Sequence, residues 1–136
     1  MSNDTSDLES NPEYAAIIPP SNSIIHNSDL KTINITFDRP IDLYKNNITI
    51  YQIDNSKRIL RQLFKPDSKL IDIDTVKNTV VLKIIDSVFN IPGATYSLEI
   101  DEKFFRYSTG INGSIFPNGN VIRRLSIQYK TGSSTF

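Results

Sequence analysis

The sequence predicts an all-β fold in which two antiparallel sheets pack face to face as a sandwich. Segments of alternating apolar and polar residues recur along the chain, and this period of two is the pattern of a half-buried strand. Isoleucine is the favoured aliphatic residue, and the 7 Phe and 6 Tyr residues add to a composition that suits pleated sheets. Clusters of Asn, Asp, Ser, Gly and Pro between the apolar segments indicate turns.

The folded part is predicted to begin near Tyr14. Residues 1–13 are rich in Ser, Asn, Asp and Glu, and their low apolar content predicts a flexible leader. They lack the basic start and the apolar run of a secretory signal peptide. Residues 15–18 are predicted to form a short edge strand that Pro19 and Pro20 end, because proline cannot donate a hydrogen bond to a neighbouring strand.

Two segments show the clearest alternation. Between residues 32 and 37, Ile33, Ile35 and Phe37 fall on one face, and Thr and Asn residues fall on the other. Residues 48–53 repeat this pattern after a break that contains a proline. Both segments are therefore predicted to be strands with one face in the core.

The middle of the chain predicts three further strands. Residues 59–64 are expected to pair back on residues 48–53 as a hairpin, and residues 70–74 alternate weakly. Residues 79–85 form an apolar, β-branched run that only Lys83 interrupts. Such a run is typical of a central strand that is covered on both faces or nearly so.

The last third of the chain predicts two strands and one connection between them, whose structure the pattern does not decide. Residues 94–100 alternate again, and residues 121–129 form the final strand. Residues 101–118 lie between them and hold several aromatic residues, which makes this connection long for a compact domain. It is either a decorated loop or an extra pair of strands.

Together these elements predict an immunoglobulin-like β-sandwich of about seven to eight antiparallel strands. The domain is expected to span residues 14–131, and residues 132–136 are expected to form a flexible tail. No apolar stretch approaches the roughly 20 residues that a membrane-spanning helix needs, so membrane insertion is not expected.

The order of the short motifs resembles the bacterial-type immunoglobulin-like domains that occur in tandem in S-layer (SbsA-like) and other cell-surface proteins. The matching motifs are Pro20-Ser21-Asn22, residues 35–41, Ile48-Thr49-Ile50, residues 78–82 and residues 93–100. The loop before Gly119-Asn120 is longer and more aromatic than in such domains. The resemblance implies a spacer or adhesion role in a larger surface protein.

Tyr96 occupies the position of the tyrosine in the sixth strand of such domains. A tyrosine at this position packs its ring in the core and returns its hydroxyl to a backbone group, which pins a connection between the sheets. We therefore expect Tyr96 to act as a structural tyrosine corner.

The composition argues against several classes of function. Fifteen basic residues balance 15 acidic residues, so no net field draws the chain to nucleic acid. The absence of Cys removes disulfides, thiolate nucleophiles and Cys-based zinc sites. His26 is the single histidine and lies in a polar turn, where we interpret it as a solvent-exposed or structural residue rather than a catalytic base.

No carboxylate cluster in the sequence has the spacing of a catalytic or metal site. Asp72 and Asp74 lie on one strand face about 7 Å apart, and we interpret them as a solvated pair rather than a glycosidase pair. No loop carries the run of carboxylates with a glycine that calcium favours. We therefore predict no enzyme activity and no cofactor.

Two kinds of surface feature remain as candidates. The sequons at Asn34, Asn47 and Asn112 are candidate N-glycosylation sites, as is a fourth at Asn3, although four sequons is only a slight excess over chance. The aromatic residues of the 101–118 connection are a candidate exposed binding patch or, alternatively, a cover over the open end of the sandwich. They are Phe104, Phe105, Tyr107 and Phe116.

These observations favour a non-enzymatic spacer, adhesion or binding module of a larger cell-surface or secreted protein. Its expected partners are a protein or carbohydrate ligand, or neighbouring domains of the same chain, and the domain itself is expected to be monomeric. Two alternatives stay open: an accessory domain of an extracellular carbohydrate-active or proteolytic enzyme, and an intracellular protein-interaction domain.

Overall fold

The structure is a computed structural model that describes residues 14–26, 30–108 and 122–132. The described residues form 11 strands and no helix, so the prediction of an all-β sandwich is confirmed. Since helices are absent from this part of the chain, none is present there that could cross a membrane.

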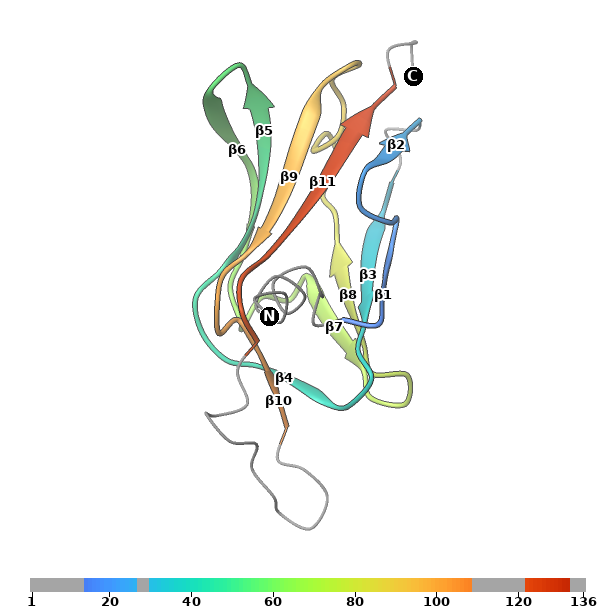
Figure 1. The fold of residues 1–136 in the computed structure, drawn as a ribbon, viewed down its shortest axis with the longest axis vertical. Coiled ribbons are helices and arrows are strands. Elements are labelled where there is room, and N and C mark those ends of the chain that lie inside the picture. Colours follow the sequence, from blue (N-terminus) through green and yellow to red (C-terminus); the bar gives the residue numbers. More distant parts are fainter. Residues whose placement is uncertain (1–13, 27–29, 109–121, 133–136) are drawn as a thin grey trace, which may run out of the picture.

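Two main sheets form the layers of the sandwich (Figure 1). One sheet has four strands in the order β1 (Ala16–Ile18), β3 (Thr32–Thr36), β8 (Thr79–Lys83) and β7 (Ile71–Asp74). The other has five strands in the order β2 (Ser23–Ile25), β11 (Leu125–Thr131), β9 (Thr95–Ile100), β5 (Ile48–Asp54) and β6 (Lys57–Phe64). Neighbouring strands are antiparallel except for β2 and β11, which run parallel.

A third, two-stranded sheet closes the lower end of the sandwich in Figure 1. It pairs β4 (Ile41–Leu43) with β10 (Phe105–Tyr107). Phe105 packs edge-on against both Phe37 and Phe104, with ring centroids 5.1 and 5.2 Å apart. This end of the core is therefore filled by aromatic rings, and part of the 101–118 connection is a strand that pairs with a distant segment rather than within itself.

The alternating residues fill the interior as the sequence pattern predicts. Side chains from both sheets are fully inaccessible to solvent there, because successive residues of a strand point to opposite faces. They include Ile33 and Ile35 of β3, Ile48 and Ile50 of β5, Val80 and Leu82 of β8, and Tyr96 and Leu98 of β9. This continuous apolar layer is the main favourable contribution to folding.

Several strand predictions need correction. The strand at residues 79–85 is central in its sheet but ends at Lys83, and only one of its faces is buried. The β-branched run therefore reflects strand propensity rather than cover on both faces. The last strand begins at Leu125 rather than near Val121, which lies outside the described residues.

Candidate functional site

The five-stranded sheet ends at an exposed, basic strand. β6 is its outermost strand and, with β5, forms a hairpin at the upper left of Figure 1. The side chains of Lys57, Arg58, Ile59 and Leu60 are all exposed, whereas Phe64 at the other end of β6 is fully buried. One strand thus has a free half and an anchored half.

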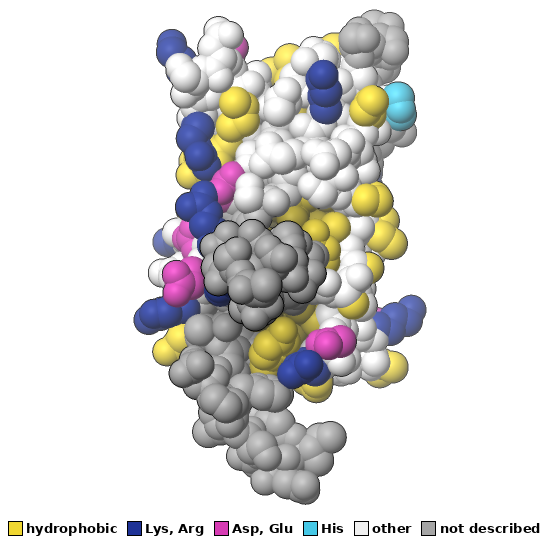
Figure 2. Space-filling view, in the orientation of Figure 1, with side chains coloured by type: hydrophobic (Ala, Val, Ile, Leu, Met, Phe, Trp, Pro, Cys, Tyr) yellow, Lys and Arg dark blue, Asp and Glu magenta, His cyan; other side chains and the backbone are white. Residues whose placement is uncertain are grey.

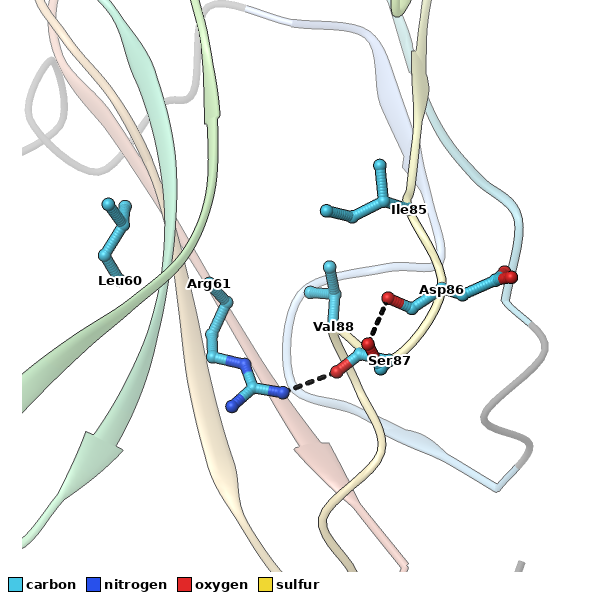
Figure 3. Close-up of a pocket in the computed structure, with 6 residues that line it drawn as sticks. All are labelled: Leu60, Arg61, Ile85, Asp86, Ser87 and Val88. Carbon is cyan, nitrogen blue, oxygen red and sulfur yellow. Dashed lines mark hydrogen bonds between the residues drawn. The ribbon is translucent and has the colours of Figure 1, made fainter.

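A β-bulge separates the two halves of β6. The pairing register with β5 shifts between Ile50, which faces Gln62, and Tyr51, which faces Leu60, so Arg61 is the extra residue. Bulges re-aim side chains, and Arg61 turns across the edge of the sandwich (Figure 3). Its guanidinium donates to the Ser87 carbonyl at 2.5 Å and to Asn90 Oδ1 at 2.9 Å.

A shallow hollow lies beside the bulge. It has a volume of about 230 Å³ and is lined by Leu60, Arg61, Ile85, Asp86, Ser87 and Val88. Figure 3 shows Arg61 reaching toward Ser87, while the Leu60 side chain points to the opposite side of β6. The exposed side chain of Ile85 adds apolar surface to the rim. The hollow therefore extends the exposed edge toward the β8–β9 connection.

Gln62 joins the two layers of the sandwich next to this hollow. Its buried side-chain amide donates to the Lys83 carbonyl at 3.0 Å and accepts from the Ile85 backbone N–H at 3.2 Å. Lys83 ends β8 in the opposite sheet. The side chain of Gln62 thus ties this end of β6 to the opposite sheet, whereas Lys57–Leu60 are four consecutive exposed residues.

The outer face of the five-stranded sheet carries a buried carboxylate. Glu99 of β9 is only 7% exposed, and its oxygens accept hydrogen bonds from Ser97, Arg124 and Ser126. Arg58 of β6 lies 3.6 Å from the same carboxylate. A buried anion needs such partners, because an unpaired buried charge is very costly.

The partners of Glu99 keep it ionised. Burial alone would raise the pKa of the Glu99 carboxyl, but the hydrogen bonds from Ser97, Arg124 and Ser126 outweigh burial and lower it. Two arginines therefore surround one satisfied carboxylate, and the local charge of this face is positive.

Basic side chains dominate the edge as a whole. Between residues 57 and 65 the chain has Lys57, Arg58, Arg61 and Lys65 and no acidic residue. The Arg58 guanidinium also stacks over the Tyr51 ring at 4.3 Å. Figure 2 shows dark blue side chains along the left side of the molecule, where β5 and β6 run, with hydrophobic side chains and several magenta acidic side chains among them.

The predicted aromatic patch is wrong for two of its residues. Phe104 and Phe105 are both 0% exposed, because the pairing of β4 with β10 draws them over the end of the core. Tyr107 is half-buried with Arg39 4.7 Å above its ring. Phe116 lies outside the described residues. The alternative interpretation, a cover over the open end of the sandwich, describes the two buried rings.

Tyr96 has the geometry expected for a corner tyrosine. Its side chain is fully buried, and its hydroxyl accepts a hydrogen bond from the Ile91 backbone N–H at 3.3 Å. Ile91 lies in the connection between β8 and β9, which crosses from one sheet to the other. A second tyrosine was not predicted: Tyr129 is 1% exposed and donates to the Pro19 carbonyl at 2.6 Å.

The sequons differ in their surroundings. Asn34 lies on the outer side of β3, between β1 and β8, and its Oδ1 atom is buried without a partner among the described residues. Asn47 is half-buried, and its backbone N–H donates to Asp101 Oδ2 at 3.0 Å. Asn112 and Asn3 lie outside the described residues. N-glycosylation stays a prediction.

The titratable residues singled out in the sequence are scattered. His26 is exposed just after β2. Asp72 pairs with Lys83 at 2.9 Å, and Asp74 Oδ1 accepts from the backbone N–H groups of Val76 and Lys77. Within residues 14–26, 30–108 and 122–132, no three His, Cys, Asp or Glu side chains come together as a metal site would require. The interpretation of the Asp pair as surface residues fits these contacts.

Solved structures that are similar to this chain have low sequence identity to it. CopC from Methylosinus trichosporium OB3b superposes with a TM-score of 0.56 and 12% identity over 90% of this chain and 94% of that chain. PcoC, a copper resistance protein from Escherichia coli, gives a TM-score of 0.47 and 12% identity over 88% of this chain and 99% of that chain. No protein-family model and no curated protein matches the sequence.

The predicted kinship with S-layer (SbsA-like) domains is wrong. The structural likeness is to CopC, and no family model supports the S-layer resemblance. The motifs behind that resemblance are alternating strands, Pro-containing turns and a corner tyrosine. Such features occur in unrelated β-sandwiches, so their order indicates the architecture and not the family.

Proposed function

We propose that this chain is a non-enzymatic binding protein whose recognition surface is the free edge of the five-stranded sheet at β6. The carrying observation is the exposure of Ile59, Leu60 and Leu63 at 39%, 58% and 43% on one strand that also bears basic residues. Exposed aliphatic side chains that gather among charged ones are typical of interaction surfaces. CopC is similar to this chain in fold alone, so the proposal rests on the exposed strand.

The side chains at this surface do not support a catalytic role. Glu99 is the most buried carboxylate near the edge, and two arginines and two hydroxyls already satisfy it. A general acid or base needs a proton that it exchanges near its working pH, whereas the pKa of Glu99 is lowered. The network stabilises the sheet rather than a reacting group.

Copper binding does not fit this chain. Copper favours thiolate, thioether and imidazole ligands, and the sequence has no Cys, one Met and one His. His26 is exposed, and no cluster of ligating side chains surrounds it among the described residues. We therefore propose a macromolecular ligand in place of a metal ion.

A selection experiment tests the binding role. Random peptides displayed on phage would be selected on the wild-type protein and counter-selected on a Leu60→Ser, Leu63→Ser double variant, which keeps the core and the charge of the edge unchanged because both side chains are exposed and uncharged. Enriched peptides should bind the wild type and lose binding to the variant. Peptides that bind both proteins equally would place recognition elsewhere and contradict the proposal.

The proposal includes an extracellular or cell-surface location and a folded unit that spans residues 14–131, as part of a longer chain. Glycosylated sequons occur in secreted proteins, so occupancy of the sequons at Asn34 and Asn47 tests this location. Mass spectrometry of protein from its native source should find a glycan on at least one of them. Unmodified asparagines at every sequon would favour the intracellular alternative.

A further inference from the structure

We infer, on the basis of the binding role proposed above, that the partner is an acidic peptide segment that adds to β6 as a further strand along Lys57–Leu60. An outermost strand presents backbone N–H and C=O groups that can pair with a new strand. β6 has 8 residues, against 3 in β2 at the opposite edge of the same sheet. The available length therefore favours β6.

The hydrogen bonds around the bulge define where the added strand would lie. Gln62 binds Lys83 and Ile85, and Arg61 binds Ser87 and Asn90, so side chains in the half of β6 next to Phe64 are already engaged. The half toward the hairpin turn has four exposed side chains in sequence. An incoming strand would thus pair beside Lys57–Leu60 and end at the hollow near Ile85.

The charge of the edge selects the partner. Lys57, Arg58, Arg61 and Lys65 lie within nine residues without an acidic residue between them. Glu99 and Asp54, which faces Lys57 on β5, offset part of this charge, and Arg124 neutralises Glu99 from the other side. Complementary charges steer association and exclude like-charged partners, so the segment should carry Asp or Glu.

The same charge argues against a second copy of this chain as the occupant. Two β6 strands placed side by side would double the positive charge along one ladder. Charged side chains, lysine above all, are a known means of keeping edge strands from pairing with one another. The positive charge therefore disfavours pairing of β6 with the β6 strand of a second copy, while it favours pairing with an acidic strand.

The two faces of β6 indicate which residue types the partner segment should carry. Leu60 and Leu63 face outward with Tyr51 and Thr49, their partners on β5, whereas Ile59 pairs with Gln52 on the other face. An added strand along Lys57–Leu60 would lie beside Leu60 on one face and Ile59 on the other, so it would cover aliphatic surface on both faces. We expect a segment in which acidic residues alternate with Val, Ile or Leu.

Peptide binding tests the inference directly. A fluorescent peptide of alternating Asp and Val would be titrated with the full-length protein, beside a peptide in which Lys replaces Asp. The acidic peptide should bind at least about tenfold more tightly, and its affinity should fall as sodium chloride is raised. N-methylation of alternate peptide amides should abolish binding, because an added strand depends on backbone hydrogen bonds.

A matched pair of charge variants locates the site. Lys57→Glu should weaken the acidic peptide by about tenfold or more, whereas Lys130→Glu makes the same charge change on β11 and should leave it within about twofold. Equal effects of the two variants would mean that net charge alone drives binding, and the inference would be wrong.

The remaining outcomes separate this inference from the binding role on which it rests. Phage-selected peptides that bind the β6 edge without acidic residues, or that tolerate N-methylation, would overturn the acidic strand and leave the binding role intact. A dimer in sedimentation experiments that Lys57→Glu disrupts would also overturn it, because the occupant would then be a second copy. Selection that fails together with acidic-peptide binding would overturn both.

Discussion

The two edges of the five-stranded sheet are protected in different ways. β2 has only 3 residues, and both of its ends are tied down: Asn22 N–H donates to the Gln128 carbonyl at 2.6 Å, and Gly132 N–H donates to the Ile25 carbonyl at 3.0 Å. β6 is longer, carries no proline and relies on basic side chains. Short length and anchored ends close an edge to every strand, whereas charge closes it only to strands of like charge.

The largest expected effect contrasts the two halves of β6. Phe64→Ala should lower the free energy of unfolding by about 3–5 kcal/mol, because it empties a fully buried site. Leu60→Ala should change it by less than about 0.5 kcal/mol, because that side chain is 58% exposed. Chemical denaturation measures both values. Similar losses would show that the strand has no free half.

The next prediction concerns the carboxylate that the arginines of this face surround. Glu99→Gln should cost about 1.5–3 kcal/mol at neutral pH, as expected for hydrogen bonds to a charged group. Since the folded-state pKa of Glu99 is lowered, its contribution is complete above the ordinary value of 4.5 and is lost as the pH falls below it.

Denaturation curves across this pH range test that contribution. The wild type should lose more stability between neutral and acidic pH than the Glu99→Gln variant, because the variant has no proton to bind at this site. Parallel pH profiles for the two proteins would show that Glu99 is not held in its ionised form.

A smaller effect is expected at the β2 edge. Tyr129→Phe removes the hydroxyl that donates to the Pro19 carbonyl and should cost about 1–2 kcal/mol. Hydrogen exchange should become faster in Ser23–Ile25, because this bond holds the chain that leads into β2. Tyr96→Phe is the matched control, since its hydroxyl binds the β8–β9 connection instead. Exchange that quickens equally in both variants would contradict an anchoring role for Tyr129.

The smallest effect on stability should come from the charges of β6. A Lys57→Gln, Lys65→Gln double variant should unfold within about 0.5 kcal/mol of the wild type, because both side chains are exposed. It should nevertheless self-associate more readily in sedimentation velocity experiments, since the repulsion between two β6 strands is reduced. Lys130→Gln on β11 should leave self-association unchanged. If the double variant stays monomeric at every concentration, positive charge is not what prevents two β6 strands from pairing.

Period-two alternation was enough to find the strands that supply most of the core. Ile33, Ile35, Ile48, Ile50 and Leu98 all lie where their spacing predicts. The short strands β2 and β4 were missed, and β10 was left open between a loop and an extra pair of strands, because three residues carry too little pattern and their pairing depends on partners far along the chain.

The candidate site could not be predicted from local pattern. Glu99 faces outward by alternation, which predicts a solvated side chain, and its burial arises only when Arg124 and Ser126 arrive from another strand. The segment of Phe104 and Phe105 lacks a regular period, so the sequence could not decide between an exposed patch and the buried cover that the structure shows. Arg61 gives no signal either, since the bulge that re-aims it is a property of the pairing with β5.

The side chain of Gln62 has a mechanical consequence. Its amide occupies the place of a missing peptide group, since it meets one carbonyl and one N–H at the end of β8. Apolar contacts between two sheets have no fixed direction, whereas the two hydrogen bonds of Gln62 do. These bonds therefore resist a sliding motion of one sheet against the other. Ile85 lies outside every strand, yet its backbone proton should exchange with solvent as slowly as those of the strand before it.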